Sequence, residues 1–214
     1  MNKKFIIFDF DGTIMNTNEV IIASWQAAAM HYLGHELPRD DIFATFGETL
    51  PHTVSYLMPG EDIMEVCEFH RQYQVKHCDD MVTVFEGVPE LLQELKDRGH
   101  KLAVATSRRQ RSFYEYMESF DMMKYFVDAV VMEDVSHHKP HPESILVAME
   151  KLGAKPEETL MVGDTKFDMG CAKNAGVESA LALWSHYIDF DELNELGYMP
   201  TYQLDKPADL LEIV

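Results

Sequence analysis

Short apolar runs recur along the chain and predict buried β-strands. They combine aliphatic and aromatic residues and lie at residues 4–10, 100–106, 126–132, 159–164 and 179–184. Segments with apolar residues at helical spacing precede or separate the last four runs, at residues 88–99, 110–120, 142–153 and 166–176. Strands that alternate with helices in this way predict an α/β fold, in which helices cover both faces of a parallel sheet.

The interval between the first and second apolar runs has a different pattern. It contains no strand-like run, and its apolar residues follow helical spacing at residues 18–34, 39–47, 50–58 and 60–78. A crossover between parallel strands needs only about a dozen residues, so this block is too long to be a simple connection. We therefore predict an α/β core made of residues 1–15 and 83–214, with residues 16–82 inserted as a helical cap.

Polar residues follow several of the predicted strands at the point where each strand ends. The carboxyl ends of parallel strands meet at one edge of the sheet, where ligands bind in open α/β folds. Each residue alone has a structural explanation: Thr106 could cap a helix, and a loop lysine is usually solvated. Their order along the chain favours a common site instead, formed by Asp9, Asp11, Thr106, Ser107, Lys139, Asp164 and Asp168.

Phosphoryl transfer through a carboxylate is the chemistry that needs this set of residues. One aspartate, Asp9, attacks phosphorus, and the second, Asp11, protonates the leaving oxygen and then activates water. Mg²⁺ prefers oxygen ligands, which Asp164, Asp9 and the backbone carbonyl of Asp11 can supply. Lys139 and the Thr106 hydroxyl are expected to neutralise and hydrogen-bond the phosphoryl oxygens.

Composition narrows the range of partners. The formal net charge is −19, which disfavours binding to nucleic acid or to an anionic membrane. No apolar run approaches the roughly 20 residues that span a bilayer, and no signal-peptide pattern is present, so we expect a cytoplasmic protein that acts on a small phosphorylated metabolite. The three cysteines, Cys67, Cys78 and Cys171, have no CxxC spacing, which predicts reduced structural thiols.

Four motifs resemble those of the haloacid dehalogenase (HAD) superfamily, in that family's order: "DFDGT", "LAVATS", "HKPHPE" and "MVGDTKFDMGCAKNAG". The resemblance covers essentially the whole chain and is nearest to phosphatases related to phosphoglycolate phosphatase and β-phosphoglucomutase. It implies a Rossmann-like core with a helical cap that closes over the site. It also implies that Asp9 is the nucleophile, Asp11 the general acid and base, and Asp164 a Mg²⁺ ligand, with Asp168 in or behind the metal shell.

The chain departs from the family pattern at three places. Asn16 stands where relatives commonly have Asp, and we expect it to cap a helix. Arginines at 108, 109 and 111 open a predicted helix, where they oppose its dipole, and Arg108 is our candidate for a substrate contact together with Ser107. Ser185 replaces a glycine of many relatives, and we expect it to lie away from the site.

The cap segment bears on the choice of substrate. Residues 16–82 contain many acidic residues, and their only basic Lys or Arg residues are Arg39, Arg71 and Lys76. This charge balance favours a small phosphomonoester such as a sugar phosphate over pyrophosphate or a nucleoside triphosphate. In the loop "FGETLPH" we expect Gly47 and Glu48 to reach the substrate, with Glu48 contacting a hydroxyl group of the substrate.

The sequence leaves two alternatives to a phosphatase open and disfavours two other activities of the superfamily. A phosphomutase shares every core residue, so it stays an alternative. A phospho-receiver module is the alternative from another class, although receivers lack so large an insertion. The second aspartate argues against a dehalogenase, and the cap has only Lys76 to serve a phosphonatase. The sequence leaves monomer or dimer undecided.

Overall fold

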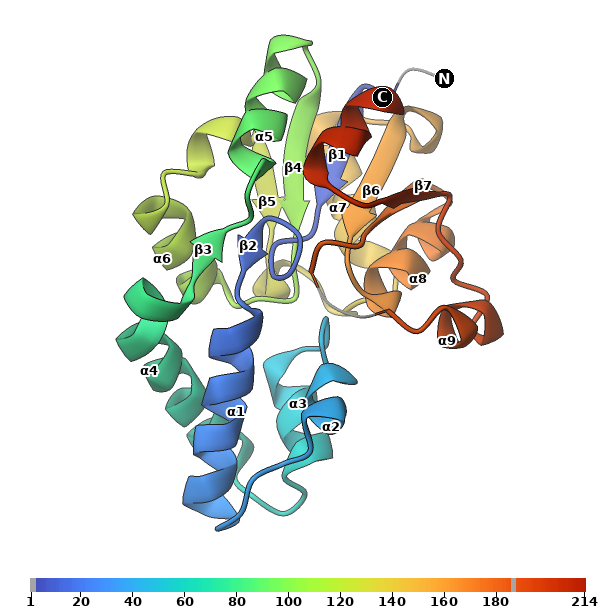
Figure 1. The fold of residues 1–214 in the computed structure, drawn as a ribbon. Helices are drawn as coiled ribbons and strands as arrows, with labels where there is room; N and C mark the ends of the chain where they lie inside the picture. Colours follow the sequence, from blue (N-terminus) through green and yellow to red (C-terminus); the bar gives the residue numbers. More distant parts are fainter. Residues whose placement is uncertain (1–2, 186–187) are drawn as a thin grey trace.

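The computed structural model describes residues 3–185 and 188–214, and a parallel sheet forms its centre (Figure 1). The strand order in this sheet is β5-β4-β1-β6-β7-β8, and each neighbouring pair is parallel. The strands are β1 (Phe5–Phe8), β4 (Lys101–Ala105), β5 (Asp128–Val130), β6 (Thr159–Gly163), β7 (Glu178–Ala182) and β8 (Tyr202–Leu204). The first five correspond to the five apolar runs of the sequence, so the predicted α/β fold with a Rossmann-like parallel sheet is confirmed. The pattern missed β8, because this edge strand is short and only Leu204 in it is buried.

Helices cover both faces of the sheet because successive residues of a strand point to opposite sides. On one face, Ile6 and Phe8 of β1 pack in a cluster with residues of α5, α6 and the short helix η4. On the other face, Ile7 packs with residues of α7 and α8. These helices are α5 (Val88–Asp97), α6 (Gln110–Ser119), α7 (Glu143–Leu152), α8 (Lys166–Ala175) and η4 (Pro207–Glu212).

The remaining elements of this part of the chain are short. The helix α9 (Phe190–Glu195) packs through Leu193 against Met169 and Leu181. Three single-turn helices connect larger elements: η1 (Met123–Tyr125), η2 (Met132–Asp134) and η3 (Pro156–Glu158). No helix among the described residues is long and apolar enough to cross a membrane.

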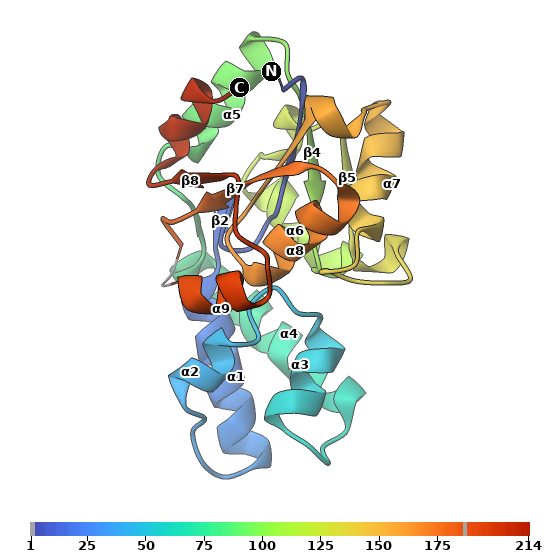
Figure 2. The same cartoon turned by 90° about the vertical axis from the view of Figure 1, so that its right-hand side faces the viewer.

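The inserted segment forms four helices that lie together beyond the carboxyl ends of the strands (Figures 1 and 2). They are α1 (Asn18–Tyr32), α2 (Arg39–Phe43), α3 (Leu50–Leu57) and α4 (Ile63–Met81). Their apolar residues form a separate cluster around Trp25, Ile42 and Val54, which has no member from the central sheet. We call these helices the cap, and the division at residues 15/16 and 82/83 into core and cap stays a prediction.

Two adjacent segments connect the core with the cap. The chain leaves through β2 (Met15–Asn16) and returns through β3 (Thr83–Val84), and these two strands pair antiparallel. The helix cap predicted for Asn16 is wrong, because Asn16 lies in β2 and Thr17 occupies the position before α1. Asn16 instead pairs with Thr83 of β3.

Of the three cysteines, two can be placed. Cys67 and Cys171 are buried and free of disulfides, as expected for structural thiols. The side chain of Cys78 lies outside the described residues.

Candidate active site

A cavity of about 330 Å³ lies between the carboxyl ends of the strands and the cap. Its core wall includes Asp9, Thr106 and Asp164, which follow β1, β4 and β6. Its cap wall includes residues of α1, of the loop before α3 and of α4. The polar residues that the sequence predicted to meet at this edge of the sheet therefore do meet there.

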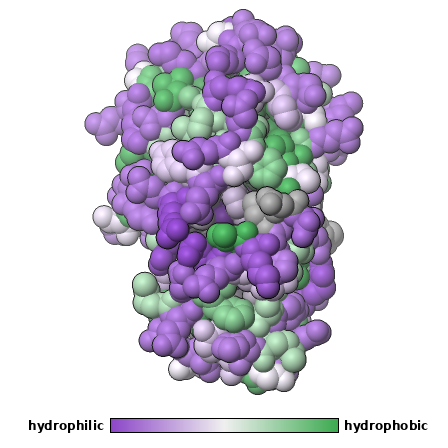
Figure 3. Space-filling model, turned by 90° about the vertical axis from the view of Figure 1, so that its left-hand side faces the viewer, coloured by the Kyte–Doolittle hydropathy of each residue, from purple (hydrophilic) through white to green (hydrophobic). Residues whose placement is uncertain are grey.

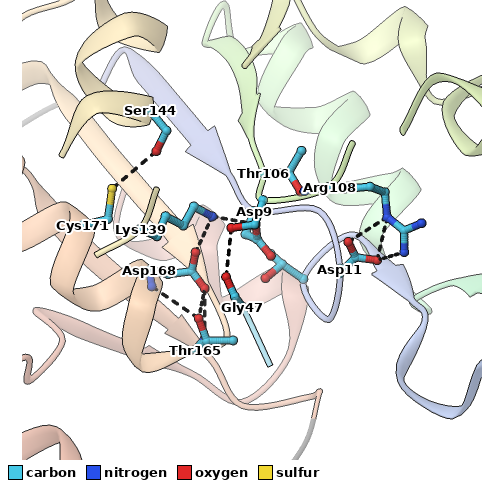
Figure 4. Close-up of polar contacts among 12 residues, drawn as sticks. Asp9, Asp11, Gly47, Thr106, Arg108, Lys139, Ser144, Thr165, Asp168 and Cys171 are labelled. Atoms are coloured by element: carbon cyan, nitrogen blue, oxygen red, sulfur yellow. Dashed lines mark hydrogen bonds and ion pairs between the residues drawn. The ribbon is translucent and has the colours of Figure 1, made fainter. Parts of the chain in front are cut away.

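A buried lysine joins two aspartates at the centre of the site (Figure 4). Lys139 Nζ lies 2.7 Å from Asp9 Oδ1 and 2.6 Å from Asp168 Oδ1, and all three side chains are buried. Burial raises the pKa of Asp9 well above its ordinary value, the nearby Asp168 and Asp164 add to this, and Lys139 opposes it. Burial lowers the pKa of Lys139, but Asp168 and Asp9 outweigh it, so that pKa is raised and the ammonium stays charged.

Asp9, Asp164 and Asp168 form a group of buried carboxylates that could hold a metal ion. One oxygen from each lies within 4.8 Å of the others. Asp164 also accepts hydrogen bonds from the Thr13 hydroxyl at 3.1 Å and from the Ser185 hydroxyl at 2.8 Å. Lys139 supplies a single positive charge among three buried carboxylates, a donor set of the kind that hard divalent cations prefer.

The carboxylate of Asp11 points away from this group and pairs with an arginine (Figure 4). Arg108 donates through Nη2 to Asp11 Oδ1 at 2.5 Å and through Nε to Asp11 Oδ2 at 2.8 Å. The Thr17 hydroxyl donates to the same Oδ1 at 2.8 Å. Arg108 was predicted to contact the substrate; in this structure its guanidinium holds Asp11, and its role toward a substrate stays a prediction.

The loop after β4 contacts the cap directly. Thr106 is buried, and its Oγ1 accepts a hydrogen bond from the backbone N–H of Arg108. Because α6 begins only at Gln110, Thr106 does not cap it. The Ser107 hydroxyl donates to the backbone carbonyl of Gly47 at 2.9 Å, so core and cap are joined at this point.

At Gly47 the backbone of the cap approaches the core closely. A Cβ atom at this position would lie 2.6 Å from Thr165 Oγ1, and its φ of +90° also favours glycine. Glu48 lines the cavity as predicted, with Oε2 3.2 Å from His52 Nδ1. The predicted positions of Gly47 and Glu48 at the cavity agree with the structure, while their contacts with a substrate stay predictions.

Sequence reasoning missed several residues of the site. Ser185 was expected to lie away from it, yet its hydroxyl bonds to Asp164 and accepts from Asn18 Nδ2 at 3.1 Å, so that expectation is wrong. His70 of α4 lines the cavity and had no motif to mark it. Thr165 was overlooked as a partner of Asp168, whose Oδ2 accepts from the Thr165 hydroxyl at 2.6 Å.

A second group of metal-binding side chains lies on the loop around Lys139. His137, His141 and Glu143 present ligand atoms within 4.8 Å of one another, but both histidines are exposed. The carboxylate of Glu143 already accepts from the backbone N–H groups of Ser136 and His137. These two hydrogen bonds fix Glu143 to the backbone of the loop, so its position needs no metal ion to explain it.

The motif order, the parallel sheet and the buried acidic site define a known class of protein. The family model described as haloacid dehalogenase-like hydrolase matches residues 6–182, and the chain belongs to this family. The resemblance stated from its motifs is therefore confirmed.

Individual relatives extend this assignment to phosphatases. A pyrophosphatase PpaX of Bacillus mycoides is 36% identical over 218 residues, which cover 100% of this chain and 98% of that protein. A pyrophosphatase PpaX of Bacillus cereus is 35% identical, with 100% and 97% covered. The predicted enzyme class is confirmed: the chain is a HAD-like phosphatase.

Solved structures of similar proteins share the fold over its full length. A protein assigned as a phosphoglycolate phosphatase from Lactobacillus plantarum superimposes with a TM-score of 0.83 at 25% identity, covering 100% of both chains. A protein assigned as a β-phosphoglucomutase from Thermotoga maritima gives a TM-score of 0.74 at 27% identity, with 100% of this chain and 98% of that chain covered. Both kinds of neighbour match the subfamily that the motifs resemble.

Proposed function

We propose that this phosphatase is Mg²⁺-dependent and works through a phosphoaspartate at Asp9. The observation that carries the proposal is the contact of Asp9 with Lys139 beside Asp164, at the end of β1, where Asp9 and Asp164 line the cavity. In this proposal Asp9, Asp164 and the backbone carbonyl of Asp11 hold Mg²⁺, with Asp168 behind them. When bound, Mg²⁺ supplies positive charge that stabilises the charge developing on the phosphoryl oxygens.

The reaction proceeds in two steps. A carboxylate oxygen of Asp9 attacks phosphorus, so that an O–P bond forms and the bond to the leaving oxygen breaks. That oxygen takes the proton of Asp11. In the second step Asp11 removes a proton from water, whose oxygen attacks phosphorus and releases orthophosphate and the free Asp9 carboxylate. Lys139 and the Thr106 hydroxyl bind the phosphoryl oxygens throughout.

Asp11 has to leave Arg108 before it can act in this scheme. The ion pair holds its carboxylate toward Arg108 and away from Lys139 (Figure 4). An incoming phosphate competes for Arg108, because guanidinium binds phosphate and carboxylate with the same fork of donors. Substrate binding and release of Asp11 are thereby coupled.

Inorganic pyrophosphate is our first candidate substrate. The relatives of highest identity given above are named pyrophosphatases. The acidic composition of residues 16–82 argued against such a substrate, but only Glu48 and Glu68 among the described acidic residues of that segment line the cavity, together with four arginines. Small phosphomonoesters of the phosphoglycolate or sugar phosphate type remain the second candidate, supported by the solved neighbours.

A phosphate-release assay tests the proposal. The panel is pyrophosphate, 2-phosphoglycolate, glucose phosphates and p-nitrophenyl phosphate, each with Mg²⁺ and with a chelator. Asp9→Asn is expected to lower turnover at least about 1,000-fold on every substrate. Asp121→Asn is the matched control, because Asp121 is exposed and pairs with the exposed Lys124.

Three results would contradict the proposal. Turnover by Asp9→Asn at the rate of the unmodified protein removes the nucleophile assignment. Formation of an isomeric sugar phosphate without orthophosphate favours the phosphomutase. Stable phosphorylation without turnover favours the phospho-receiver.

A further inference from the structure

Two buried polar atoms in the cavity have no hydrogen-bond partner among the described residues. They are His70 Nε2 on α4 and Arg109 Nε at the start of α6. Both residues line the same cavity as Asp9. Unpaired buried polar groups cost free energy, so these two atoms call for a partner such as an ordered water, an ion or a bound ligand.

His70 is held in place on the cap wall of the cavity. It is 4% exposed, and its ring packs on Trp25 with centroids 4.4 Å apart. Cys67, Arg71 and Gln74 lie at helical spacing on the same side of α4 and line the cavity with it. Burial, with help from the positive charge of Arg108, lowers the pKa of His70 to about 3, so the ring is neutral and carries one N–H, which the unpaired Nε2 donates in the Nε2–H tautomer.

Arg109 differs from the other arginines of the cavity in its pairing. Arg71 pairs with Glu68 at 2.7 Å, Arg111 with Glu115 at 3.0 Å, and Arg108 with Asp11. Within residues 3–185 and 188–214, no carboxylate pairs with Arg109. Its guanidinium therefore carries uncompensated positive charge into the cavity.

The start of α6 strengthens this charge. Arg109 occupies the position before the helix, and its own side chain does not cap the first turn, whose backbone N–H groups are directed out of the helix end. Glu133 satisfies the N–H of Gln110 only. The other acidic residue nearby, Glu68, is held by Arg71 through two hydrogen bonds.

Acidic residues of the cap do not cancel this positive end. Most of them are exposed on its surface, and the face that carries α4 and α6 is largely hydrophilic (Figure 3). Exposed charges are screened by water and salt, whereas those inside a cavity act at short range through a poorer dielectric. The local charge at Arg109, not the charge of the whole cap, decides which group can enter.

We infer that Arg109 and His70 bind the second phosphoryl group of pyrophosphate, the leaving group of the reaction at Asp9. Arg109 supplies the charge and His70 a neutral N–H donor, at the end of the cavity formed by α4 and α6. This inference rests on the proposed function, because it assumes that the first phosphoryl group lies at Asp9. A substrate whose leaving group is neutral gains nothing from these two residues.

A comparison of two substrates tests the assignment. Arg109→Gln is expected to lower kcat/KM for pyrophosphate about 30-fold, because a hydrogen bond to a charged group typically contributes this much. The kcat/KM for p-nitrophenyl phosphate is expected to change less than about 3-fold. His70→Phe keeps a ring against Trp25 and removes the N–H, so it is expected to give the same selectivity with a smaller loss of about 5-fold. Arg39→Gln is the control, since Arg39 is exposed on the cap and pairs with Glu19.

Inhibition provides a second measurement that needs no turnover of pyrophosphate. Imidodiphosphate, which has two phosphoryl groups and resists hydrolysis, is used as a competitor against p-nitrophenyl phosphate. Arg109→Gln is expected to raise its inhibition constant about 10-fold or more and to leave that of orthophosphate unchanged. Thermal unfolding of each variant checks that the fold is intact.

The outcomes separate this inference from the proposed function. Equal losses on both substrates in Arg109→Gln, an unchanged pyrophosphatase rate, or no pyrophosphatase activity in the unmodified protein would each overturn the leaving-group site. An active Asp9→Asn would overturn the proposed function instead. Loss of all activity in Asp9→Asn together with selective loss in Arg109→Gln supports both.

Discussion

Arg108 holds the carboxylate of Asp11 with two of its nitrogens, Nη2 at 2.5 Å and Nε at 2.8 Å from the two carboxylate oxygens. The guanidinium also lies over the ring of Tyr116, 4.6 Å from its centroid. Its side chain is 8% exposed and that of Asp11 is 25% exposed. The pair is thus partly withdrawn from water. In such an environment the strength of an ion pair depends on its geometry as well as on its charges.

A double-mutant cycle measures this pair. The cycle uses Arg108→Met, which keeps the packing on Tyr116, Asp11→Asn and the double variant. The free energy of unfolding of each is measured in urea. We expect a coupling energy of about 1–3 kcal/mol, because a bidentate, partly buried pair exceeds an ordinary surface ion pair. The exposed pair Lys124 and Asp121 serves as the reference, with expected coupling below about 1 kcal/mol. Equal coupling in both pairs would refute a special role for the Arg108 contact.

His70 makes the protein sensitive to acid. Its pKa is about 3 in the folded protein and near 6.5 when unfolded. Between these values the unfolded chain binds the proton and the folded one does not, so stability is lost as pH falls below 6.5. His70→Phe removes this contribution. Between pH 7 and pH 4 the free energy of unfolding is expected to fall in both proteins. The fall in His70→Phe is expected to be about 3 kcal/mol smaller than the fall in the unmodified protein.

Urea unfolding at several pH values checks the effect of His70. His35, which is exposed at the end of the cap, provides the control variant His35→Phe. Parallel pH profiles for the unmodified protein and His70→Phe would show that the ring titrates normally when folded.

Ser185 is expected to tune metal binding through Asp164. Its hydroxyl donates to Asp164 Oδ2 at 2.8 Å and orients that carboxylate. Loss of an oriented partner of a ligand typically weakens metal binding about 10–100-fold. Ser185→Ala is therefore expected to raise the Mg²⁺ concentration for half-maximal activity about 10-fold, while activity at saturating Mg²⁺ changes little. Ser55→Ala, at an exposed site on α3, is the control. An unchanged Mg²⁺ dependence would argue that Asp164 is not a ligand or is oriented by Thr13 alone.

Gly12 is required because the backbone passes directly beside Asp164. A Cβ atom there would collide with Asp164 Oδ2, and φ is +78°. Gly34 has a similar φ of +76°, but a Cβ atom added to it would meet no atom of the described residues within 4 Å. Gly34→Ala is expected to cost about 1 kcal/mol for its backbone alone, and Gly12→Ala about 3 kcal/mol or more with loss of activity. Equal costs in urea unfolding would mean that Asp164 can move aside freely.

The sequence by itself determined the sheet and the members of its acidic site. Buried strands are apolar along their whole length, so five of the six strands stood out, and their carboxyl ends carry Asp9, Thr106 and Asp164 in order. Residues that follow such strands must lie at one edge because parallel strands run in one direction. Among the strands of the central sheet, β8 escaped the pattern because it has a single buried residue.

Only the tertiary structure decided the pairing and the local charge. Arg108 could face substrate or solvent in the sequence, but folding brings it to Asp11, 97 positions away. The hydroxyl of Ser185 and the ring of His70 reached the site in the same way, from segments without a motif. The cap's many acids suggested a negative cavity, whereas most of them face water and Arg109 faces inward. Composition sums charges over a segment, but electrostatic energy depends on distance and burial, which only the folded chain defines.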